Sequence, residues 1–364
     1  NFNGYFGSTE ERVDQKPLDT DAGYQRYGIG AEGWGYDYHK WDARFDVSAN
    51  PNEPHRAGYI VEIDPADPTS TPVKHTALGR FKHENAEVVI AGNGRVEVYM
   101  GDDERGEYIY RFVSEGAYAV GGETSELLDK GTLYAARFNS DGSGKWLALT
   151  PETTGMGSAA EISVFTRMAA SAVKATTMDR PEWVAAHPNK AEVYCALTNN
   201  KNRGVKPNKG GDATPAVGPN PREKNNYGQI VRWYPDGDDH AAAVGLVLAH
   251  QVGQRLGLVR AHFGRGLAER GWRVVALDER GKVRTSEAFA ARLRSFEDRS
   301  TPGVVFALGS DLGLAREFVG RADETLSLGA MTLPHLLARL VLWEQLYRAT
   351  QILGGGAYHR NCVQ

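Results

Sequence analysis

The sequence predicts a multidomain chain, in which an all-β part built as an incomplete β-propeller precedes a small α/β domain. Strand-like runs fill the first 240 residues, strand and helix patterns alternate from residue 272, and the composition changes between the two parts. Residues 1–240 carry a net charge of −9 and residues 241–364 one of +5, while Asn falls from 15 residues to 1. We therefore place a domain boundary at residues 236–240, which gives domains 1–240 and 241–364.

The composition excludes several classes of protein. A chain of 364 residues with 41% hydrophobic residues can fill real cores and is not wholly disordered. No apolar run approaches the roughly 20 residues that cross a bilayer, so we expect no membrane partner. Two cysteines exclude a disulfide framework and a four-cysteine zinc site. The first residues contain no leader in which a basic stretch precedes an apolar one, so we expect no signal peptide. They also lack an initiator Met, so we expect that the natural N-terminus is missing.

The first part is predicted to be β-structure, because runs of aromatic and β-branched residues are separated by Gly, Asn, Asp and Pro. The turn pairs Asn93-Gly94 and Asp141-Gly142 suit tight hairpins. Blades of about 40–50 residues would number only about five in this part, which predicts an open ring. The polar loop 201–226 is long enough to suspect a function. The expected strands are residues 58–65, 95–100, 107–113, 132–138, 192–197 and 229–234.

The second part alternates strand and helix. Residues 272–277 and 303–308 are short apolar runs, typical of buried parallel strands. Between them a helix is expected to begin after Thr285, a good N-cap residue. Pro334 stands where a first helical residue is favoured, and the stretch to Leu353 carries an apolar face.

Carboxylates beside turns are the candidate chemistry of the first part. Glu84, the cluster 102–104 and Glu182 could supply oxygens to a hard cation such as Ca²⁺, together with the carbonyls of residues 199–200. Arg180 could pair with a phosphate oxygen. The alternative is that these carboxylates are solvated or cap turns. His83 could be a ligand or structural, and Cys195, inside an apolar strand, is expected to be an inert buried thiol.

Three segments of the second part are expected at the carboxyl ends of its parallel strands, where ligands favour α/β sheets. They are residues 277–278, 308–314 and 327–334. Gly309, Gly313 and Gly329 would permit close backbone approach to a flat ligand. The alternative is an ordinary glycine-rich turn, and residues 354–360 taken alone would be a disordered tail.

Six motifs of the first part, in order, resemble the PhoX-type phosphatases. They are residues 1–7 (Asn-Phe-Asn-Gly-Tyr-Phe-Gly), 33–36 (Gly-Trp-Gly-Tyr), 79–86 (Gly-Arg-Phe-Lys-His-Glu-Asn-Ala), 98–103 (Val-Tyr-Met-Gly-Asp-Asp), 179–183 (Asp-Arg-Pro-Glu-Trp) and 194–200 (Tyr-Cys-Ala-Leu-Thr-Asn-Asn). The resemblance implies a propeller whose channel holds calcium and iron and hydrolyses phosphate monoesters. It implies that Glu84, Glu182 and Asp103 bind metal and that Arg180 binds phosphate. In the family a cysteine and further carboxylates precede the first motif, so we expect weak metal binding and little phosphatase activity.

Motifs of the second part resemble the RlmH-type SPOUT methyltransferases. They are residues 275–282 (Val-Ala-Leu-Asp-Glu-Arg-Gly-Lys), 286–290 (Ser-Glu-Ala-Phe-Ala), 308–314 (Leu-Gly-Ser-Asp-Leu-Gly-Leu), 326–335 (Leu-Ser-Leu-Gly-Ala-Met-Thr-Leu-Pro-His), 344–349 (Glu-Gln-Leu-Tyr-Arg-Ala) and 357–360 (Ala-Tyr-His-Arg), within a match of about 272–360. The resemblance implies a C-terminal trefoil knot, a homodimer and S-adenosylmethionine-dependent methylation of pseudouridine N3 in large-subunit ribosomal RNA.

The same resemblance implies the site residues of this part. The cofactor would be cradled by Leu277, Gly309, Gly313, Gly329, Ala330, Met331, Thr332, Leu333 and Pro334. The residues expected to face the substrate or shape the site are His335, Arg348, Tyr358, His359 and Arg360. Ser310 and Ala357 depart from the family pattern, so we expect weakened cofactor binding.

The two resemblances together predict a joined chain, truncated at the junction near His240. The methyltransferase part is the more complete one and implies a cytoplasmic protein, whereas a phosphatase context implies the periplasm or secretion. One alternative is that PhoX-type alkaline phosphatase is the main activity. Another is that the propeller part is an inert appendage that serves as a binding module.

Overall fold

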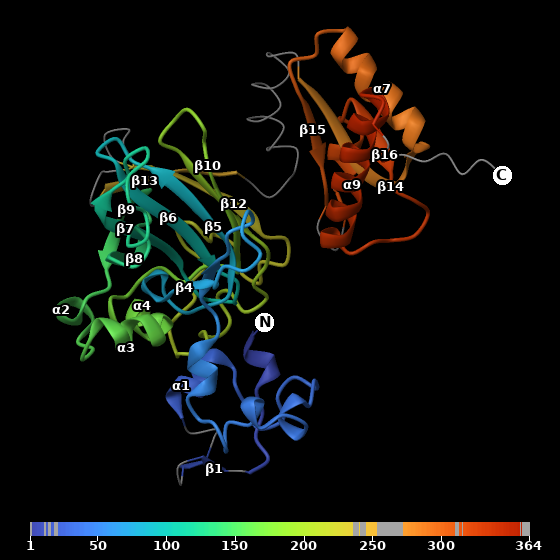
Figure 1. Cartoon of the computed structure of the whole chain (residues 1–364). Coiled ribbons are helices and arrows are strands. Elements are labelled where there is room, and N and C mark those ends of the chain that lie inside the picture. The colour runs from blue at the N-terminus through green and yellow to red at the C-terminus, as the bar shows by residue number, and fades with distance from the viewer. Residues whose placement is uncertain are drawn as a thin grey trace. The chain divides into compact units, whose positions relative to one another are not determined.

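The chain divides into two compact units, Asn1–Val252 and Gly253–Gln364 (Figure 1). The computed structural model describes residues 2–10, 12–13, 16–17, 21–235, 240, 245–252, 272–309, 313–314, 316–356 and 358. Every cluster of buried hydrophobic residues in the described part lies within one unit. The boundary expected at residue 240 stays a prediction. His240 itself packs in the first unit, where its carbonyl accepts a hydrogen bond from Arg111 at 2.9 Å.

A nine-stranded antiparallel sheet forms the centre of the first unit. The strand order is β10-β11-β12-β13-β9-β8-β7-β6-β5. Nine of the described strands of this unit thus form one sheet, four others form two small two-stranded sheets, and the propeller stays a prediction. The strands are β5 (His83–Ile90), β6 (Arg95–Asp102), β7 (Ile109–Ala117), β8 (Gly131–Phe138), β9 (Ser143–Ala148), β10 (Pro181–Ala186), β11 (Val193–Leu197), β12 (Gln229–Pro235) and β13 (Gly245–Val252).

The two edge strands of this sheet, β5 and β10, are tied to each other. The Asn85 side chain donates to the Val184 carbonyl at 2.6 Å and accepts from the Val184 N–H at 2.8 Å. The Glu87 carboxylate accepts from the Ala186 N–H at 2.9 Å. At Gly101, on β6, an added Cβ would lie 2.7 Å from the Pro181 carbonyl oxygen, so only glycine permits this approach.

The central strands β6, β7 and β8 are covered on both faces. One core cluster joins them to the helices α3 (Ala159–Val164) and α4 (Thr166–Ala172). The other joins them to β10, β11 and β12 around the fully buried Trp233. Burial on both faces explains the nearly continuous apolar pattern of these strands. The remaining described elements of the unit are η1 (Phe2–Tyr5), β1 (Arg12–Val13), β2 (Lys16–Pro17), α1 (Ala22–Tyr27), η3 (Tyr38–Lys40), η4 (Ala43–Phe45), η5 (Glu53–Arg56), β3 (Ile60–Glu62), β4 (Val73–His75), η6 (Thr76–Leu78) and α2 (Pro151–Thr154).

The second unit is a small α/β domain. Its three strands β14 (Arg273–Val283), β15 (Val304–Ala307) and β16 (Glu324–Ser327) pair in parallel in the order β15-β14-β16. Helices α7 (Ser286–Asp298) and α9 (His335–Leu353) share one core cluster with the sheet, and α8 (Arg316–Val319) packs with residues such as Ala276 in another. The order of strands and helices is the one expected from the sequence.

Most expected strands and helices are present. The α7 helix has Thr285 as its N-cap, with the side chain accepting from the Ala288 N–H at 3.2 Å. Pro334 is the N-cap of α9 and not its first helical residue, which shifts the expected start by one position. The helices α1 to α4 were not expected in the β-rich part. Their short lengths explain this, because four to seven residues hold too few turns for a helical period to be recognised.

The closure of the sheet can be tested at Asn85. The substitution Asn85→Ala would leave the buried N–H and C=O of Val184 without these partners, which we expect to lower the free energy of unfolding by about 1–3 kcal/mol. Urea unfolding followed by tryptophan fluorescence measures this change. The exposed control Asn189→Ala should change stability by less than about 0.5 kcal/mol, and equal stability of both variants would contradict this role.

Candidate functional site

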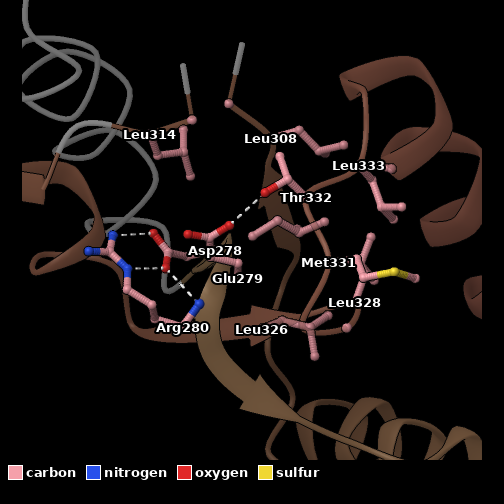
Figure 2. A pocket seen from close by; sticks show the side chains of 15 residues that line it. Asp278, Glu279, Arg280, Leu308, Leu314, Leu326, Leu328, Met331, Thr332 and Leu333 are labelled. Carbon is pink, nitrogen blue, oxygen red and sulfur yellow. Dashed lines mark hydrogen bonds and ion pairs between the residues drawn. The ribbon is translucent and has the colours of Figure 1, made fainter. Parts of the chain in front are cut away.

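A cavity of about 360 Å³ lies where the three parallel strands of the second unit end. Its walls come from residues 277–280 of β14 and from the segments at the ends of β15 and β16 (Figure 2). Parallel pairing brings the carboxyl ends of strands to one sheet edge, and this explains why segments some 20 to 30 residues apart in sequence meet here.

The first wall is an excursion in β14. Leu277 and Lys282 both pair with Leu326, so residues 278–281 leave the ladder between them. Arg280 holds Asp278 through its Nε and Nη2 groups, each at 2.8 Å (Figure 2). The hydrogen bond from Arg280 lowers the pKa of Asp278 to about 2, so this carboxylate stays ionised at neutral pH. The excursion therefore places the Asp278–Arg280 ion pair at the cavity.

The second wall depends on Gly309. A Cβ added at this residue would lie 2.3 Å from the Gly313 carbonyl carbon and 2.6 Å from the Leu314 nitrogen. Gly313 itself has a φ of +73°, a conformation that glycine adopts without strain. The two glycines allow the chain to return close to its own strand end, with Leu308 and Leu314 facing the cavity.

The third wall follows β16. The Ser327 hydroxyl donates to the Gly329 carbonyl at 2.9 Å and accepts from its N–H at 3.2 Å, which fixes the turn. Thr332 donates to the Glu279 carboxylate at 3.0 Å and joins the third wall to the first (Figure 2). Met331 is 79% exposed at the rim.

Seven of the nine residues expected to cradle a cofactor line this cavity. They are Leu277, Gly309, Gly313, Gly329, Met331, Thr332 and Leu333, whereas Ala330 and Pro334 belong to the same segment without lining it. Sequence reasoning assigned no role to Glu279, Arg280 and Ala338, which also line it. The signal for the first two was Gly281, where an added Cβ would lie 2.8 Å from the backbone of Leu326 and which therefore marks the excursion.

Two of the residues expected to face the substrate, Arg348 and Tyr358, do not line this cavity. Arg348 pairs with Glu344 on α9, and the Tyr358 hydroxyl donates to the same carboxylate at 3.3 Å. The Tyr358 ring also meets Tyr347 edge to face, with a centroid separation of 4.9 Å. Arg348 and Tyr358 are thus brought together, but away from the lining of the cavity. His359, Arg360 and the His335 side chain lie outside the described residues, as does Ser310.

The expected site of the first unit is a cluster of three carboxylates and one arginine. Arg180 donates from Nη2 to Asp103 at 2.9 Å and to Glu182 at 3.1 Å, and its Nε lies 2.7 Å from the other Asp103 oxygen. Burial, and then the charges of Asp103 and Glu182, raise the pKa of Glu84. Arg180 has a φ of +58°, a left-handed conformation that is uncommon for arginine and often marks a functional site. The structure therefore brings Glu84, Asp103, Arg180 and Glu182 together.

These residues do not fit a metal ion as they lie. Within the described part of the chain, no group of three or more His, Cys, Asp or Glu side chains is arranged to hold a metal. The cluster 102–104 shows why, because each carboxylate has its own cation. Asp102 pairs with Arg167 at 2.6 Å, Asp103 with Arg180, and Glu104 with Lys82 at 2.9 Å. Asp102 is fully buried and so is not solvated, but its carboxylate also accepts a hydrogen bond from the Lys82 N–H at 3.2 Å, as the alternative of capping a backbone group expected.

Two further residues considered as candidates are structural. His83 stacks on Phe81 with a centroid separation of 3.7 Å and its Nε2 lies 3.0 Å from the Gly79 carbonyl, while burial lowers its pKa to about 4. Cys195 is fully buried, and burial raises the pKa of its thiol, so the expected inert thiol is confirmed. In the described residues no helix combines the length and apolarity that a membrane span requires.

Comparison with known proteins matches the two units to different families. The family described as alkaline phosphatase PhoX matches residues 1–290, and the family described as predicted SPOUT methyltransferase matches residues 261–359. The solved structure of Pseudomonas fluorescens PhoX in complex with vanadate, a transition state analogue, is 47% identical. It superposes with a TM-score of 0.62 over 68% of this chain and 44% of that chain.

The curated relatives match the second unit. Ribosomal RNA large subunit methyltransferase H of Rhodospirillum centenum is 52% identical over 87 residues, which are 24% of this chain and 57% of the relative. The protein of the same name from Acidiphilium cryptum is 56% identical over 87 residues, 24% of this chain and 54% of the relative. The chain thus spans little more than half of these relatives and under half of the PhoX structure.

The family match over residues 1–290 covers most of the chain, while the second match begins inside it. The chain therefore belongs to the alkaline phosphatase PhoX family, and a region similar to the SPOUT methyltransferases is joined to its C-terminal side.

Proposed function

We propose that the second unit binds S-adenosylmethionine in the cavity at its strand ends and methylates pseudouridine N3 in large-subunit ribosomal RNA. The observation that carries this proposal is the convergence of three backbone segments on one cavity at the carboxyl edge of a parallel sheet. The similarity to the ribosomal RNA methyltransferases supports the choice of cofactor and substrate.

The cavity suits a cofactor of this kind. Its volume of about 360 Å³ falls in the range of ligand pockets, about 300–1,000 Å³. Leu277, Leu308 and Leu314 offer apolar walls to a flat base, and the glycine turns let backbone groups approach it. Bound S-adenosylmethionine supplies an already activated methyl group, so the protein needs chiefly to align the accepting nitrogen and exclude water.

The side chains that contact the substrate are proposed to come from the C-terminal part of the chain. Arg348 and Tyr358 would orient the RNA together with His335, His359 and Arg360, and Arg348 would add positive charge for the phosphate backbone. Because Arg348 and Tyr358 do not line the cavity of their own chain, a homodimer would have to bring them to a partner's cavity. The described face of α9 supports a dimer, since Leu337, Leu340, Trp343 and Tyr347 are 44–65% exposed.

For the first unit, we propose a fragment of a calcium- and iron-dependent phosphate-monoester hydrolase with weak metal binding and little turnover. The ion pairs of Arg180 with Asp103 and Glu182 support this, because the guanidinium group competes with a metal cation for these carboxylates. In PhoX-type enzymes these strands would belong to a propeller, and the second unit would end in a trefoil knot. Both finer features of the fold are proposals here.

The proposed methyltransferase would work in the cytoplasm, and a main activity as phosphatase would place the chain in the periplasm or outside the cell. A binding module is the second alternative, and the exposed aromatic residues Trp34, Tyr36, Tyr38 and Trp41 of the first unit favour it. Assays of both activities on the full chain distinguish these readings. Methyl transfer supports the methyltransferase, ester hydrolysis supports a main activity as phosphatase, and the absence of both activities supports a binding module.

The cofactor site can be tested with a matched pair of glycine substitutions. Gly309→Ala places a methyl group against the Gly313 backbone and should weaken S-adenosylmethionine binding at least tenfold, or about 1.4 kcal/mol. At Gly320 an added Cβ would lie 3.4 Å from the Arg316 carbonyl oxygen, and this residue does not line the cavity, so Gly320→Ala should bind like the wild type. Calorimetry on the full chain measures both affinities. Absence of binding by the wild type, or equal binding by both variants, would refute the site.

The dimer can be tested on α9. Leu340→Glu puts a charge on the exposed apolar face and should convert a dimer into a monomer, because burying an unpaired carboxylate is costly. Sedimentation velocity measures the mass. Val120→Glu changes an equally apolar residue that is 92% exposed in the first unit and should leave the dimer intact. A monomeric wild type would contradict the proposal.

Calcium binding tests whether the proposed metal site of the first unit is impaired. The wild type should bind calcium more weakly than about 10⁻³ M and hydrolyse a chromogenic phosphate ester no faster than buffer. Arg180→Gln frees Asp103 and Glu182 and should tighten calcium binding, whereas Arg44→Gln, at an exposed ion pair, should not. Brisk ester hydrolysis by the wild type would overturn the proposal of an impaired site.

A further inference from the structure

A second cavity lies at the opposite edge of the sheet in the second unit, where the three strands begin. Its volume is about 520 Å³. Arg273 and the pair Asp323 and Glu324 stand at the starts of β14 and β16, and residues 300–302 lead into β15. Arg292 and Arg299 reach it from α7. None of these residues lines the proposed cofactor cavity.

Positive charge exceeds negative charge in this cavity. Asp323 pairs with Arg273 at 3.2 Å, and its other oxygen accepts from the Val274 N–H at 2.8 Å. Glu324 lies between Arg292 and Arg284, the latter at 3.1 Å. The cavity is therefore lined by three guanidinium groups, those of Arg273, Arg292 and Arg299, and by two carboxylates, an excess of one positive charge.

Arg299 supplies the excess charge. No carboxylate of the described residues lies within ion-pair distance of its side chain, which is exposed at the end of α7. The next residue, Ser300, has a φ of +51°, and its N–H donates to the Glu297 carbonyl at 2.8 Å, while the Thr301 N–H donates to the Phe296 carbonyl at 2.9 Å. The backbone donors of this turn are thus used, and Ser300 and Thr301 line the same cavity as Arg299.

The arginines are crowded. The Arg292 guanidinium stacks on the Phe296 ring at 4.1 Å and donates to the Ser295 hydroxyl at 2.7 Å, which fixes its plane. Burial, and then the charges of Arg299, Arg284 and Arg273, lower the pKa of Arg292. An anion placed among these groups would relieve their mutual repulsion.

We infer that this cavity binds a phosphate group, held by Arg299 and Arg273 with the Ser300 and Thr301 hydroxyls. The excess positive charge of the lining attracts a phosphate anion, and the planar arginine fork matches its oxygens. The group can belong to a free phosphate compound or to an RNA backbone. This inference does not depend on the methyltransferase proposal, because the site lies at the other strand edge.

Pyrophosphate is the probe, and calorimetry on the full chain is the measurement. Arg299→Gln should weaken binding about tenfold, as expected for the loss of one charge-assisted hydrogen bond. Arg294→Gln, on the same helix but outside the cavity and paired with Glu297, is the matched control and should bind like the wild type. Arg180→Gln removes the candidate phosphate-binding side chain of the first unit and should not affect pyrophosphate binding to the cavity of the second unit. Arg299 is exposed, so loss of fold is not expected, and thermal melting checks it.

A short RNA oligonucleotide distinguishes the two sources of phosphate. If RNA competes with pyrophosphate and loses affinity in Arg299→Gln, the cavity holds the RNA backbone. If pyrophosphate binds at this site without competition by RNA, the ligand is a free phosphate compound. Absence of pyrophosphate binding by the wild type would overturn the inference. Undiminished binding in Arg299→Gln, or equal weakening in Arg294→Gln, would overturn it as well.

Discussion

Parallel pairing of β14 with β15 and β16 is the constraint on which the second unit depends. It places the three carboxyl ends at one edge and the three amino ends at the other, and each edge carries a cavity of its own. The two cavities differ in chemistry as well as in place. Leucines, glycine turns and an ionised Asp278 form the first, and arginines dominate the second. One small sheet therefore presents an apolar pocket suited to a flat cofactor and a basic pocket suited to a phosphate.

Buried ion pairs have the corresponding role in the first unit. Asp102 with Arg167, Glu97 with Arg111 and Asp179 with Arg203 are all nearly inaccessible to water. A buried charge is tolerated when a partner compensates it, and removing one partner of such a pair is strongly destabilising. The same arrangement continues to the surface at Arg180, which holds Asp103 and Glu182. Asp103 and Glu182, which resemble metal ligands in the sequence, thus share the guanidinium of Arg180, while Glu84 lies beside them with a raised pKa.

The sequence predicts those features that depend on local pattern. Runs of aromatic, β-branched and apolar residues located the strands β6, β7, β8, β11, β12, β14 and β15. Thr285 located the start of α7, and the glycines at 309, 313 and 329 marked two of the three segments around one cavity. Features that depend on distant partners were not predictable. The tie between Asn85 and Val184 joins residues 99 positions apart, and Arg167 reaches Asp102 across 65 positions. The excursion at 278–281 also escaped prediction, because the apolar run ends at Leu277, where the strand was expected to end, and the resumed pairing at Lys282 depends on the distant Leu326.

The central claim is that the cavity at the carboxyl edge of this sheet is the cofactor site of the chain. Hydrogen–deuterium exchange with and without S-adenosylhomocysteine, the demethylated product, tests it most directly because the method reports where a ligand binds. The account predicts slower exchange at residues 277–281, 308–314 and 327–333, and unchanged exchange in the sheet of the first unit. Slower exchange elsewhere, or no change at all under saturating ligand, would contradict it.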